Sequence, residues 1–392
     1  MKFPRKIRSA AKAAKGIAAI ILSLCILCGC TEVEEEVPES AGTADVYTSS
    51  LEEGDIGGYI YNQLSDKEKE YYRIMRDAVY NFEEEAVFPE ALPPETLRKI
   101  FVSVYYGENE VFWLDSVFYR HQSDSFTHKL DYRFTSEEAE AMQREIDLAV
   151  NGLFSSIDAN ANDYEKLLAF HDKLVTTCTF NEGTEYSNTI YGALVTGAAQ
   201  CEGYAFTFEY LCKQAGIECF TVTGTNPQGA LHAWNMVNLD GMWYHVDCTW
   251  DDPILETPDP DFIRHYYFLA CDSDIIGVTH ITDNTYFTYP ICTSKENYYK
   301  REGLYAQSGE EGVQLLRSAA VSALSNGRKD AAVRFADKKS YENAYTKLFD
   351  NKEIRDVFAY VNSVSPRRVL ESKYVRYSNE DELIIHISMF YE

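Results

Sequence analysis

Apolar residues recur at helical spacing in the first part of the chain. Ser65-Asp-Lys-Glu68 has the form of a capping box, in which a serine and a glutamate three residues later satisfy each other's backbone N–H groups. Pro93-Pro94 and Thr135-Ser-Glu-Glu138 are comparable start signals, and they predict helices that reach Tyr106 and Val150. The first of these helices is expected to bury one apolar face, formed by Tyr71, Met75, Ala78 and Phe82.

Mixed helix and strand patterns also occupy the gaps between these helices and the end of the chain. Glu110–Tyr119 and His128–Phe134 are expected to be strands. From about residue 301 the pattern predicts further helices and strands, namely a helix over Gly312–Ser325, a strand over Ala331–Phe335, helices within Ser340–Asn362, and strands near Val369–Tyr377 and Glu382–Tyr391. Both flanking regions are therefore expected to be small α+β domains, and neither contains a recognisable constellation of reactive residues.

The central part contains two further helices and a hairpin. Asn162 or Asp163 is expected to cap a helix, on which His171 has a packing or surface role. A second helix begins near Cys201 and stops at Lys213 and Gly216. The apolar positions of these two helices are Tyr164, Leu167, Leu168 and Leu174 in the first, and Tyr204, Ala205, Phe208, Leu211 and Cys212 in the second.

The length of 392 residues exceeds what one compact core usually holds, so two or three domains are expected. We predict a signal peptide over residues 1–30, an acidic tether over 31–57, an N-terminal α+β domain over 58–150, a catalytic core over 151–300 and a C-terminal α+β domain over 301–392. The aromatic content of 14% excludes a mainly disordered or low-complexity chain.

The first thirty residues have the composition of an export signal. Six basic residues precede an apolar run from Gly16 to Leu27 that is too short to cross a bilayer as a mature helix. Leu27-Cys28-Gly29-Cys30 resembles a bacterial lipobox, which implies lipidation of Cys30 and cleavage just before it. The alternative is an ordinary secretory signal that contains cysteine. Either way we expect export, and the lipobox places the protein on the extracellular face of a bacterial cell membrane.

Charge and cysteine content narrow the partners. The formal net charge is −26, and residues 31–392 carry 30 basic and 62 acidic residues, or −32, which argues against nucleic acid and anionic lipid surfaces as principal partners. Eight cysteines remain from Cys30 onward, without zinc spacing. Asp158-Ala-Asn-Ala-Asn162 lacks the glycine and glutamate of a calcium loop, because Asp163 and Ala169 stand at those positions. We therefore expect neither a metal nor a cofactor.

Cys201 is the candidate nucleophile. The start of a helix carries unpaired N–H groups and the positive end of the helix dipole, and both favour a thiolate over a thiol. The same N–H groups can face an oxyanion that forms on an attacked carbonyl.

A hairpin supplies a candidate base and its partner. His232–Asn238 and Met242–Cys248 are strand-like, and Asn238-Leu-Asp-Gly241 is a turn signal. A four-residue loop puts His232 opposite Asp247, and a two-residue Asp-Gly loop shifts the pairing by one diagonal but keeps both on one face. A three-residue loop without a bulge would separate their faces.

Packing the cysteine helix on this hairpin would complete a Cys201–His232–Asp247 triad, in which Asp247 orients the imidazole that moves the proton. His245 is the rival base, but a residue two positions away on the same strand cannot readily turn its ring onto Asp247. Trp234 is expected either to shield the thiolate in the substrate pocket or to be a core aromatic. Asp251 and Asp252 are expected to form a turn before Pro253.

Three segments resemble the core motifs of the transglutaminase-like superfamily, in the family's order. They are Gln-Cys201-Glu-Gly-Tyr-Ala, Leu-His232-Ala-Trp-Asn and Trp-Tyr-His-Val-Asp247-Cys-Thr-Trp. The resemblance covers roughly residues 160–290 and implies a papain-like α+β core with thiol chemistry on amides. It marks Cys201, His232 and Asp247 as the triad.

One feature departs from the family pattern. Animal transglutaminases stabilise the oxyanion with a tryptophan upstream of the nucleophile, and here no tryptophan lies between Trp113 and Trp234. Gln200 or Tyr191 is the expected substitute. Nothing resembling the calcium sites of those enzymes is evident.

The expected function is thiol-dependent cleavage of peptide or isopeptide bonds, in cell-wall peptides or other protein substrates. The alternatives are an acyltransferase, in which a lysine amine replaces water at the thioester, and a binding lipoprotein without catalysis. The first two need the same triad, so the sequence does not separate them.

Overall fold

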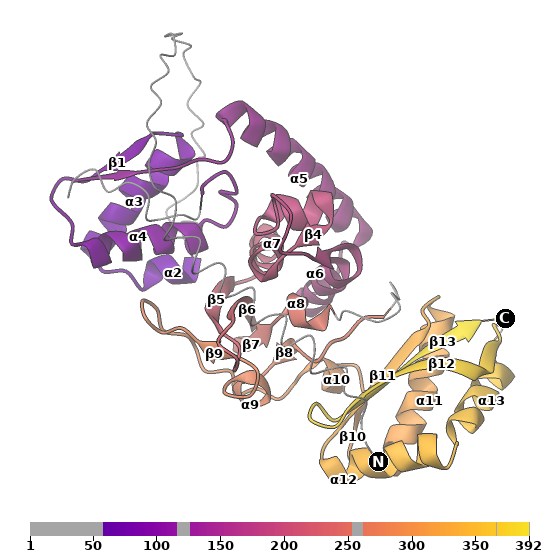
Figure 1. The fold of residues 1–392 in the computed structure, drawn as a ribbon. Helices are drawn as coiled ribbons and strands as arrows, with labels where there is room; N and C mark the ends of the chain where they lie inside the picture. Colours follow the sequence, from indigo (N-terminus) through magenta and orange to yellow (C-terminus); the bar gives the residue numbers. More distant parts are fainter. Residues whose placement is uncertain (1–57, 116–125, 253–261, 366, 392) are drawn as a thin grey trace.

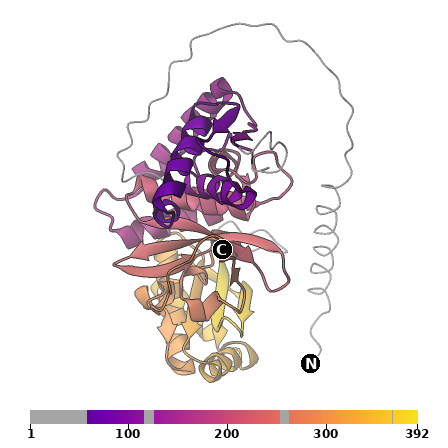
Figure 2. The same ribbon diagram turned by 90° about the vertical axis from the view of Figure 1, so that its left-hand side faces the viewer.

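The computed structural model describes residues 58–115, 126–252, 262–365 and 367–391. A five-stranded sheet crosses the middle of the molecule, with the N-terminal helices on one side and the C-terminal unit on the other (Figures 1 and 2). The predicted signal peptide, the lipidation site Cys30 and the acidic tether lie outside the described residues. Within the described ranges, no helix combines the length and apolarity that a membrane span requires.

The N-terminal region is mainly helical. Its two predicted capping boxes are confirmed, at Ser65 before α3 and at Thr135 before α5. The start of a helix at Pro93-Pro94 is confirmed by α4. The elements are α2 (Gly58–Asn62), α3 (Asp66–Tyr80), β1 (Glu85–Val87), α4 (Pro94–Gly107), β2 (Thr127–Lys129) and α5 (Ser136–Ser156).

The two strands predicted in this region are largely wrong. The described part of Glu110–Tyr119 is a turn with one bridge from Leu114 to Tyr132, and the second strand shrinks to β2. Consecutive residues from Val111 to Leu114 are all buried, which a strand with alternating faces cannot achieve. The Trp113 indole donates to the carbonyl of Val79 and ties this turn to α3.

The central region consists of helices packed on an antiparallel sheet, as predicted. The strand order is β8-β7-β6-β5-β9, and every neighbouring pair is antiparallel. The Asn235 amide on β6 donates to the carbonyl of Ala205 on α7, so α7 packs on this face of the sheet. The opposite face carries a small apolar cluster formed by Phe220, Val222, Trp234, Met236 and Cys292.

The bounds of the central elements follow the chain. They are α6 (Asp163–Thr177), β3 (Thr179–Phe180), η1 (Gly192–Thr196), β4 (Ala198–Ala199), α7 (Cys201–Gln214), β5 (Cys219–Thr225), β6 (Leu231–Leu239), β7 (Met242–Val246), α8 (Cys248–Asp251), β8 (Phe268–Ala270), α9 (Asp272–Ile275), β9 (Ile281–Thr282) and α10 (Tyr298–Arg301).

The β6–β7 connection is the two-residue alternative of the predicted hairpin. Leu239 pairs with Met242, so only Asp240 and Gly241 form the turn. Their φ angles are 56° and 77°, the left-handed conformation that a tight hairpin turn requires at both positions.

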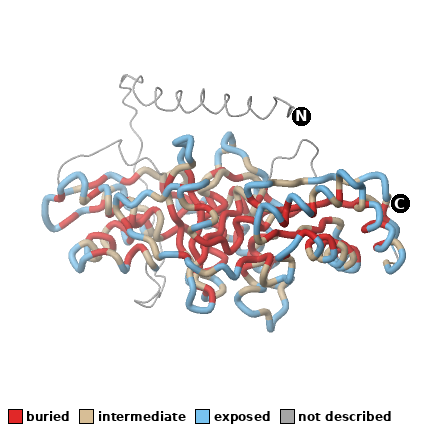
Figure 3. Tube along the Cα trace, turned by 90° about the horizontal axis from the view of Figure 1, so that it is seen from below, coloured by how far each residue is buried: buried red, intermediate tan, exposed pale blue. Residues whose placement is uncertain are grey.

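The C-terminal region forms its own core, with a sheet in the order β10-β11-β13-β12. Its elements agree with the predicted pattern of helices and strands: β10 (Tyr305–Ala306), α11 (Gly309–Ser325), β11 (Asp330–Phe335), α12 (Lys338–Tyr345), η2 (Thr346–Asp350), α13 (Ile354–Val364), β12 (Val369–Asn379) and β13 (Ile384–Tyr391). Buried positions run through the centre of the molecule and into this unit (Figure 3).

The N-terminal and central regions share one hydrophobic cluster, which extends from Ile60 to Tyr299 and includes Ile384 of β13. Helix α5 also runs across residue 150, where the sequence predicts a boundary. The predicted division into domains therefore stays a prediction, whereas the α+β class with a papain-like central core is confirmed.

Candidate active site

Cys201 is the first residue of α7, as predicted. The residue before it, Gln200, has an extended backbone and makes no side-chain cap. The first N–H groups of a helix have no partner within the helix. Cys201 is a free thiol and is partly exposed. Its sulfur therefore lies where unpaired N–H groups are available to a negative charge.

The start of α7 is held against the preceding loop. The Gln200 amide donates to the Ser187 carbonyl at 2.7 Å. A Cβ added at Gly203 would lie 2.5 Å from the same carbonyl oxygen, so only glycine allows this approach. The position of Cys201 thus depends on two backbone contacts to Ser187.

His232 and Asp247 meet at the end of the hairpin. The His232 Nε2 to Asp247 Oδ2 distance is 2.7 Å, and both side chains are almost fully buried. In the observed register Asp247 follows the last residue of β7, one diagonal away from His232. The second oxygen of Asp247 accepts from the Trp250 amide at 3.1 Å and caps the short helix α8.

This pairing shifts both acidities. Burial disfavours charge on His232, but the charge and hydrogen bond of Asp247, with a contact to Cys201, raise the pKa of His232 to about 10. Burial opposes the Asp247 charge as well, yet His232 and His280 hold the pKa of this carboxyl well below its usual range. Since Nε2 is engaged by Asp247, Nδ1 is the nitrogen available to the Cys201 thiol.

The structure adds a histidine that sequence reasoning missed. His280 Nε2 lies 2.8 Å from Asp247 Oδ2, the oxygen that also binds His232. His280 is fully buried and comes from the segment between α9 and β9. It stands 33 residues beyond Asp247 in no motif, and its only sequence signal is its place within the region of family resemblance.

His245 does not contact Asp247. Its Nδ1 accepts from the Trp234 indole at 3.0 Å, and its Nε2 lies 2.9 Å from Asp272. The geometry thus favours His232 over this rival. Trp234 is buried in the sheet, and its ring stacks on His232 with centroids 5.8 Å apart, so it is a core aromatic that also packs against the imidazole.

The two oxyanion candidates lie in different surroundings. Gln200 immediately precedes the thiol, whereas the Tyr191 hydroxyl donates to Glu145 on α5 at 2.6 Å. Their role in oxyanion binding stays a prediction.

The N-terminal region reaches the residue beside the thiol. Tyr106 of α4 donates to Glu202 at 2.9 Å, and Asn188 donates to the same carboxylate at 3.4 Å. Burial raises the pKa of Glu202, and these hydrogen bonds oppose that rise. Sequence patterns gave no sign of this contact, because it joins residues almost a hundred positions apart.

A second buried network lies behind the site. His171 of α6 is buried, and its two ring nitrogens lie 3.0 Å from Asp172 and 3.2 Å from Asp251. Asp251 also accepts from the backbone amides of Tyr266 and Tyr267. Burial opposes the charge, but the two carboxylates raise the pKa of His171 to about 9. The surface alternative for His171 is therefore wrong, and Asp251 organises a turn as predicted.

Three groups of side chains in the described ranges have metal-ligand atoms within 4.8 Å of one another: His171, Asp172 and His265; His232, Asp247 and His280; and His245, Asp272 and Cys292. In each group a carboxylate lies within hydrogen-bond distance of ring nitrogens. His171 faces carboxylates with both nitrogens, and His245 accepts from Trp234 at Nδ1, so its Nε2 carries the proton toward Asp272. Hydrogen bonds therefore account for these groups.

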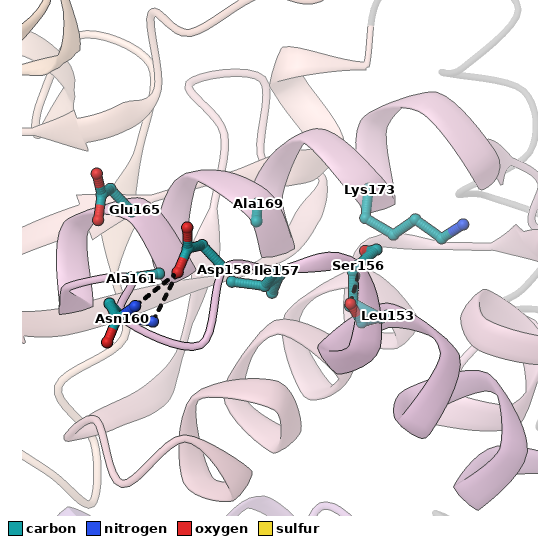
Figure 4. A pocket seen from close by; sticks show the side chains of 9 residues that line it. All are labelled: Leu153, Ser156, Ile157, Asp158, Asn160, Ala161, Glu165, Ala169 and Lys173. Carbon is teal, nitrogen blue, oxygen red and sulfur yellow. Dashed lines mark hydrogen bonds between the residues drawn. The ribbon is translucent and has the colours of Figure 1, made fainter.

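A hollow of about 560 Å³ opens between the end of α5 and the start of α6 (Figure 4). Asp158 on its wall accepts two hydrogen bonds from Asn160, and Asn162 caps α6. These side chains are thus used for the turn and the cap, and none of the predicted triad residues lines the hollow.

Comparisons with known proteins agree with this core. The profile of the Transglutaminase-like superfamily matches residues 153–248. The kyphoscoliosis peptidases of Mus musculus and Homo sapiens are each 36% identical over 105 residues, covering 23% of this chain and 16% of those proteins. The chain thus spans about a sixth of the length of these relatives.

Among solved structures, the periplasmic domain of TgpA from Pseudomonas aeruginosa bound to ethylmercury is 17% identical, with a TM-score of 0.22, over 35% of this chain and 64% of that one. The superfamily includes cysteine peptidases and acyltransferases. Residues 153–248, which contain Cys201, His232 and the first part of the Asp247 turn, form a transglutaminase-like domain.

Proposed function

We propose that this protein is an exported, lipid-anchored cysteine enzyme that cleaves peptide or isopeptide amide bonds through Cys201, His232 and Asp247. The observation that carries the proposal is the 2.7 Å contact between His232 and Asp247, with Cys201 in contact with the same imidazole at the start of α7. This arrangement meets the geometric test for a thiol nucleophile with an oriented base.

In the proposed reaction the Cys201 sulfur attacks the amide carbonyl carbon and forms a C–S bond. The charge on the oxygen faces the free N–H groups of α7. His232 gives its proton to the leaving nitrogen as the C–N bond breaks, which leaves a thioester and a free amine. Water then adds to the thioester carbonyl, gives a proton to His232 and releases the acid as the C–S bond breaks. Asp247 keeps its charge and holds His232 throughout.

The location and substrate class are part of the same proposal. The basic leader and Cys30 support export and a lipid anchor on the extracellular face of a bacterial membrane. A protein or peptide substrate, including cell-wall peptide, suits thiol chemistry on amides. The net charge of −26 disfavours nucleic acid as a partner.

Covalent labelling tests the activated thiol without knowledge of the substrate. The full chain is treated with iodoacetamide near pH 7, and alkylation of the Cys201 peptide is followed by mass spectrometry. We expect His232→Ala to slow alkylation at least tenfold, because the imidazolium that stabilises the thiolate is lost. Equal rates in both proteins would contradict the proposal.

Hydrolysis and acyl transfer differ in what resolves the thioester. Incubation with a glutamine-containing peptide, with and without excess primary amine, separates them: free acid supports hydrolysis and amine incorporation supports transfer. Cys201→Ala is expected to abolish either product while the fold survives. Full product formation by Cys201→Ala refutes the proposal, and no product from the wild type across peptide and cell-wall substrates favours a binding protein.

A further inference from the structure

We propose that His280 is a positioning residue that fixes the Asp247 carboxylate and, through it, the His232 imidazole. The inference rests on the proposed function for its catalytic meaning. Its structural content, that His280 determines how firmly Asp247 holds His232, can be tested without any substrate.

The hydrogen bonds define the form of His280. Asp247 is a carboxylate and can only accept, so the His280 nitrogen that faces it at 2.8 Å, Nε2, carries a proton. The other nitrogen lies 2.9 Å from the Thr279 hydroxyl. In the neutral ring this nitrogen accepts from Thr279, which therefore selects the tautomer that donates to Asp247.

Two imidazoles and one backbone amide then hold the carboxylate. Oδ2 accepts from His232 at 2.7 Å and from His280 at 2.8 Å, while Oδ1 accepts from the Trp250 amide. The two oxygens are thus bound from different elements, which leaves the carboxylate little freedom to rotate away from His232. Without His280, Oδ2 would keep His232 alone.

The ring of His280 is itself fixed. Backbone hydrogen bonds join the His280 amide to the Ile275 carbonyl and the Gly277 amide to the His280 carbonyl. Aromatic rings enclose the imidazole on several sides, with centroids between 4.7 and 5.6 Å away: Trp234, Trp250, His232 and Tyr267. A donor held this rigidly in a dry site fits a positioning role.

The charge balance agrees with a neutral donor. The titratable groups that face His280 are Asp247 after β7, His232 on β6 and His245 on β7. Burial lowers the pKa of His280, and Asp247 opposes this only in part. His280 therefore adds a hydrogen bond to Asp247 without competing with His232 as the cation.

The test reads the His232 ring directly. Full-length protein with 13Cε1-labelled histidine is titrated by NMR, with the His232 signal assigned by its loss in His232→Gln. In the wild type we expect a midpoint near pH 10. In His280→Ala we expect it at least one pH unit lower, because Asp247 is free to turn away. His280→Gln, whose amide can replace Nε2–H, should restore the midpoint to within about half a unit.

Alkylation of Cys201 by iodoacetamide near pH 7 gives a second readout. We expect His280→Ala to react about tenfold more slowly than the wild type, since one unit in pKa corresponds to a factor of ten. The matched control is His128→Ala, which removes a buried histidine of β2 outside the site. It should leave both the midpoint and the alkylation rate unchanged.

An unchanged His232 midpoint in folded His280→Ala overturns the inference, and so does a loss that His280→Gln does not restore. If His280→Ala does not fold, Thr279→Val and Thr279→Ser decide: valine should lower the midpoint and serine should keep it, and equal midpoints overturn the inference. Failure of the proposed function gives a different result, namely wild-type alkylation no faster than in His232→Ala whatever His280 does.

Discussion

At the residue scale, the charge of Asp247 is the feature on which His232 depends. Asp247→Asn keeps the size of the side chain but removes the charge that raises the pKa of His232 to about 10. The pKa should fall toward the usual 6.5, and amide turnover should drop by roughly two to four orders of magnitude. The measurement is initial-rate kinetics together with alkylation of Cys201 between pH 6 and 10. Asp283→Asn removes an exposed charge elsewhere and should leave both rates unchanged; equal losses in the two variants would contradict the prediction.

Gly203 is a residue-scale requirement for the position of the thiol. Helix propensity favours alanine over glycine by about 1 kcal/mol, but the new Cβ would lie 2.5 Å from the Ser187 carbonyl. We expect Gly203→Ala to lower the free energy of unfolding by about 1 to 3 kcal/mol in urea titrations and to slow alkylation of Cys201.

Gly152 on α5 offers the matched control, because a Cβ there would meet nothing within 4 Å. Gly152→Ala should therefore raise the free energy of unfolding by about 0.5 to 1 kcal/mol. If both substitutions stabilise the protein, the close approach at Gly203 is not a constraint.

At the scale of elements, the two-residue turn sets the register of the His–Asp hairpin. Gly241 has φ 77° and open space around it, so alanine there meets only the backbone cost of the left-handed conformation. We expect Gly241→Ala to lower the free energy of unfolding by about 1 to 2 kcal/mol. Asp240→Asn should change it by less than about 0.5 kcal/mol, since asparagine tolerates this conformation. Denaturant titration distinguishes the two, and a cost for asparagine as large as for alanine would disprove the account.

Local signals predicted the elements that carry the site. The capping boxes, the cysteine helix and the Asp-Gly turn act over a few residues, so the sequence revealed them directly. The contact of His280 with Asp247 and that of Tyr106 with Glu202 depend on how distant elements pack, and no local periodicity encodes that. The strand predicted at Glu110 failed for the same reason, because tertiary burial of four consecutive residues overrode the pattern.

Helix α6 is joined to the turn after Asp247 by a charge that depends on pH. The pKa of His171 is raised from 6.5 to about 9 between Asp172 and Asp251, which corresponds to about 3 kcal/mol of stability. Because the folded pKa is above the unfolded one, this stability is fully present below pH 6.5 and is lost as the pH rises to about 9. His171→Gln should therefore cost more stability at pH 6 than at pH 9.5, measured by urea titration at both. A cost independent of pH would mean that packing alone is lost.

At the scale of the whole molecule, the chain on both sides of the core reaches the site. Tyr106 from the N-terminal region binds Glu202 beside the thiol, while Arg264 binds Glu382 of the C-terminal unit at 2.6 Å. Arg264 also donates to the Trp250 carbonyl at 3.2 Å, and the Trp250 amide binds Asp247. The C-terminal unit thus supports the turn that holds the predicted triad.

The ion pair of Arg264 with Glu382 should therefore couple this unit to the core. Both side chains are about nine-tenths buried, and removing one partner leaves a buried charge unpaired. We expect Glu382→Ala to lower the free energy of unfolding by about 3 kcal/mol, to separate the thermal transition of the C-terminal unit in calorimetry and to slow alkylation of Cys201. Glu380, two residues earlier, pairs with Lys338 at 3.6 Å while both side chains are 59% exposed, so Glu380→Ala should cost less than about 0.5 kcal/mol. A single unshifted transition in Glu382→Ala would show that the two parts are held together by other contacts.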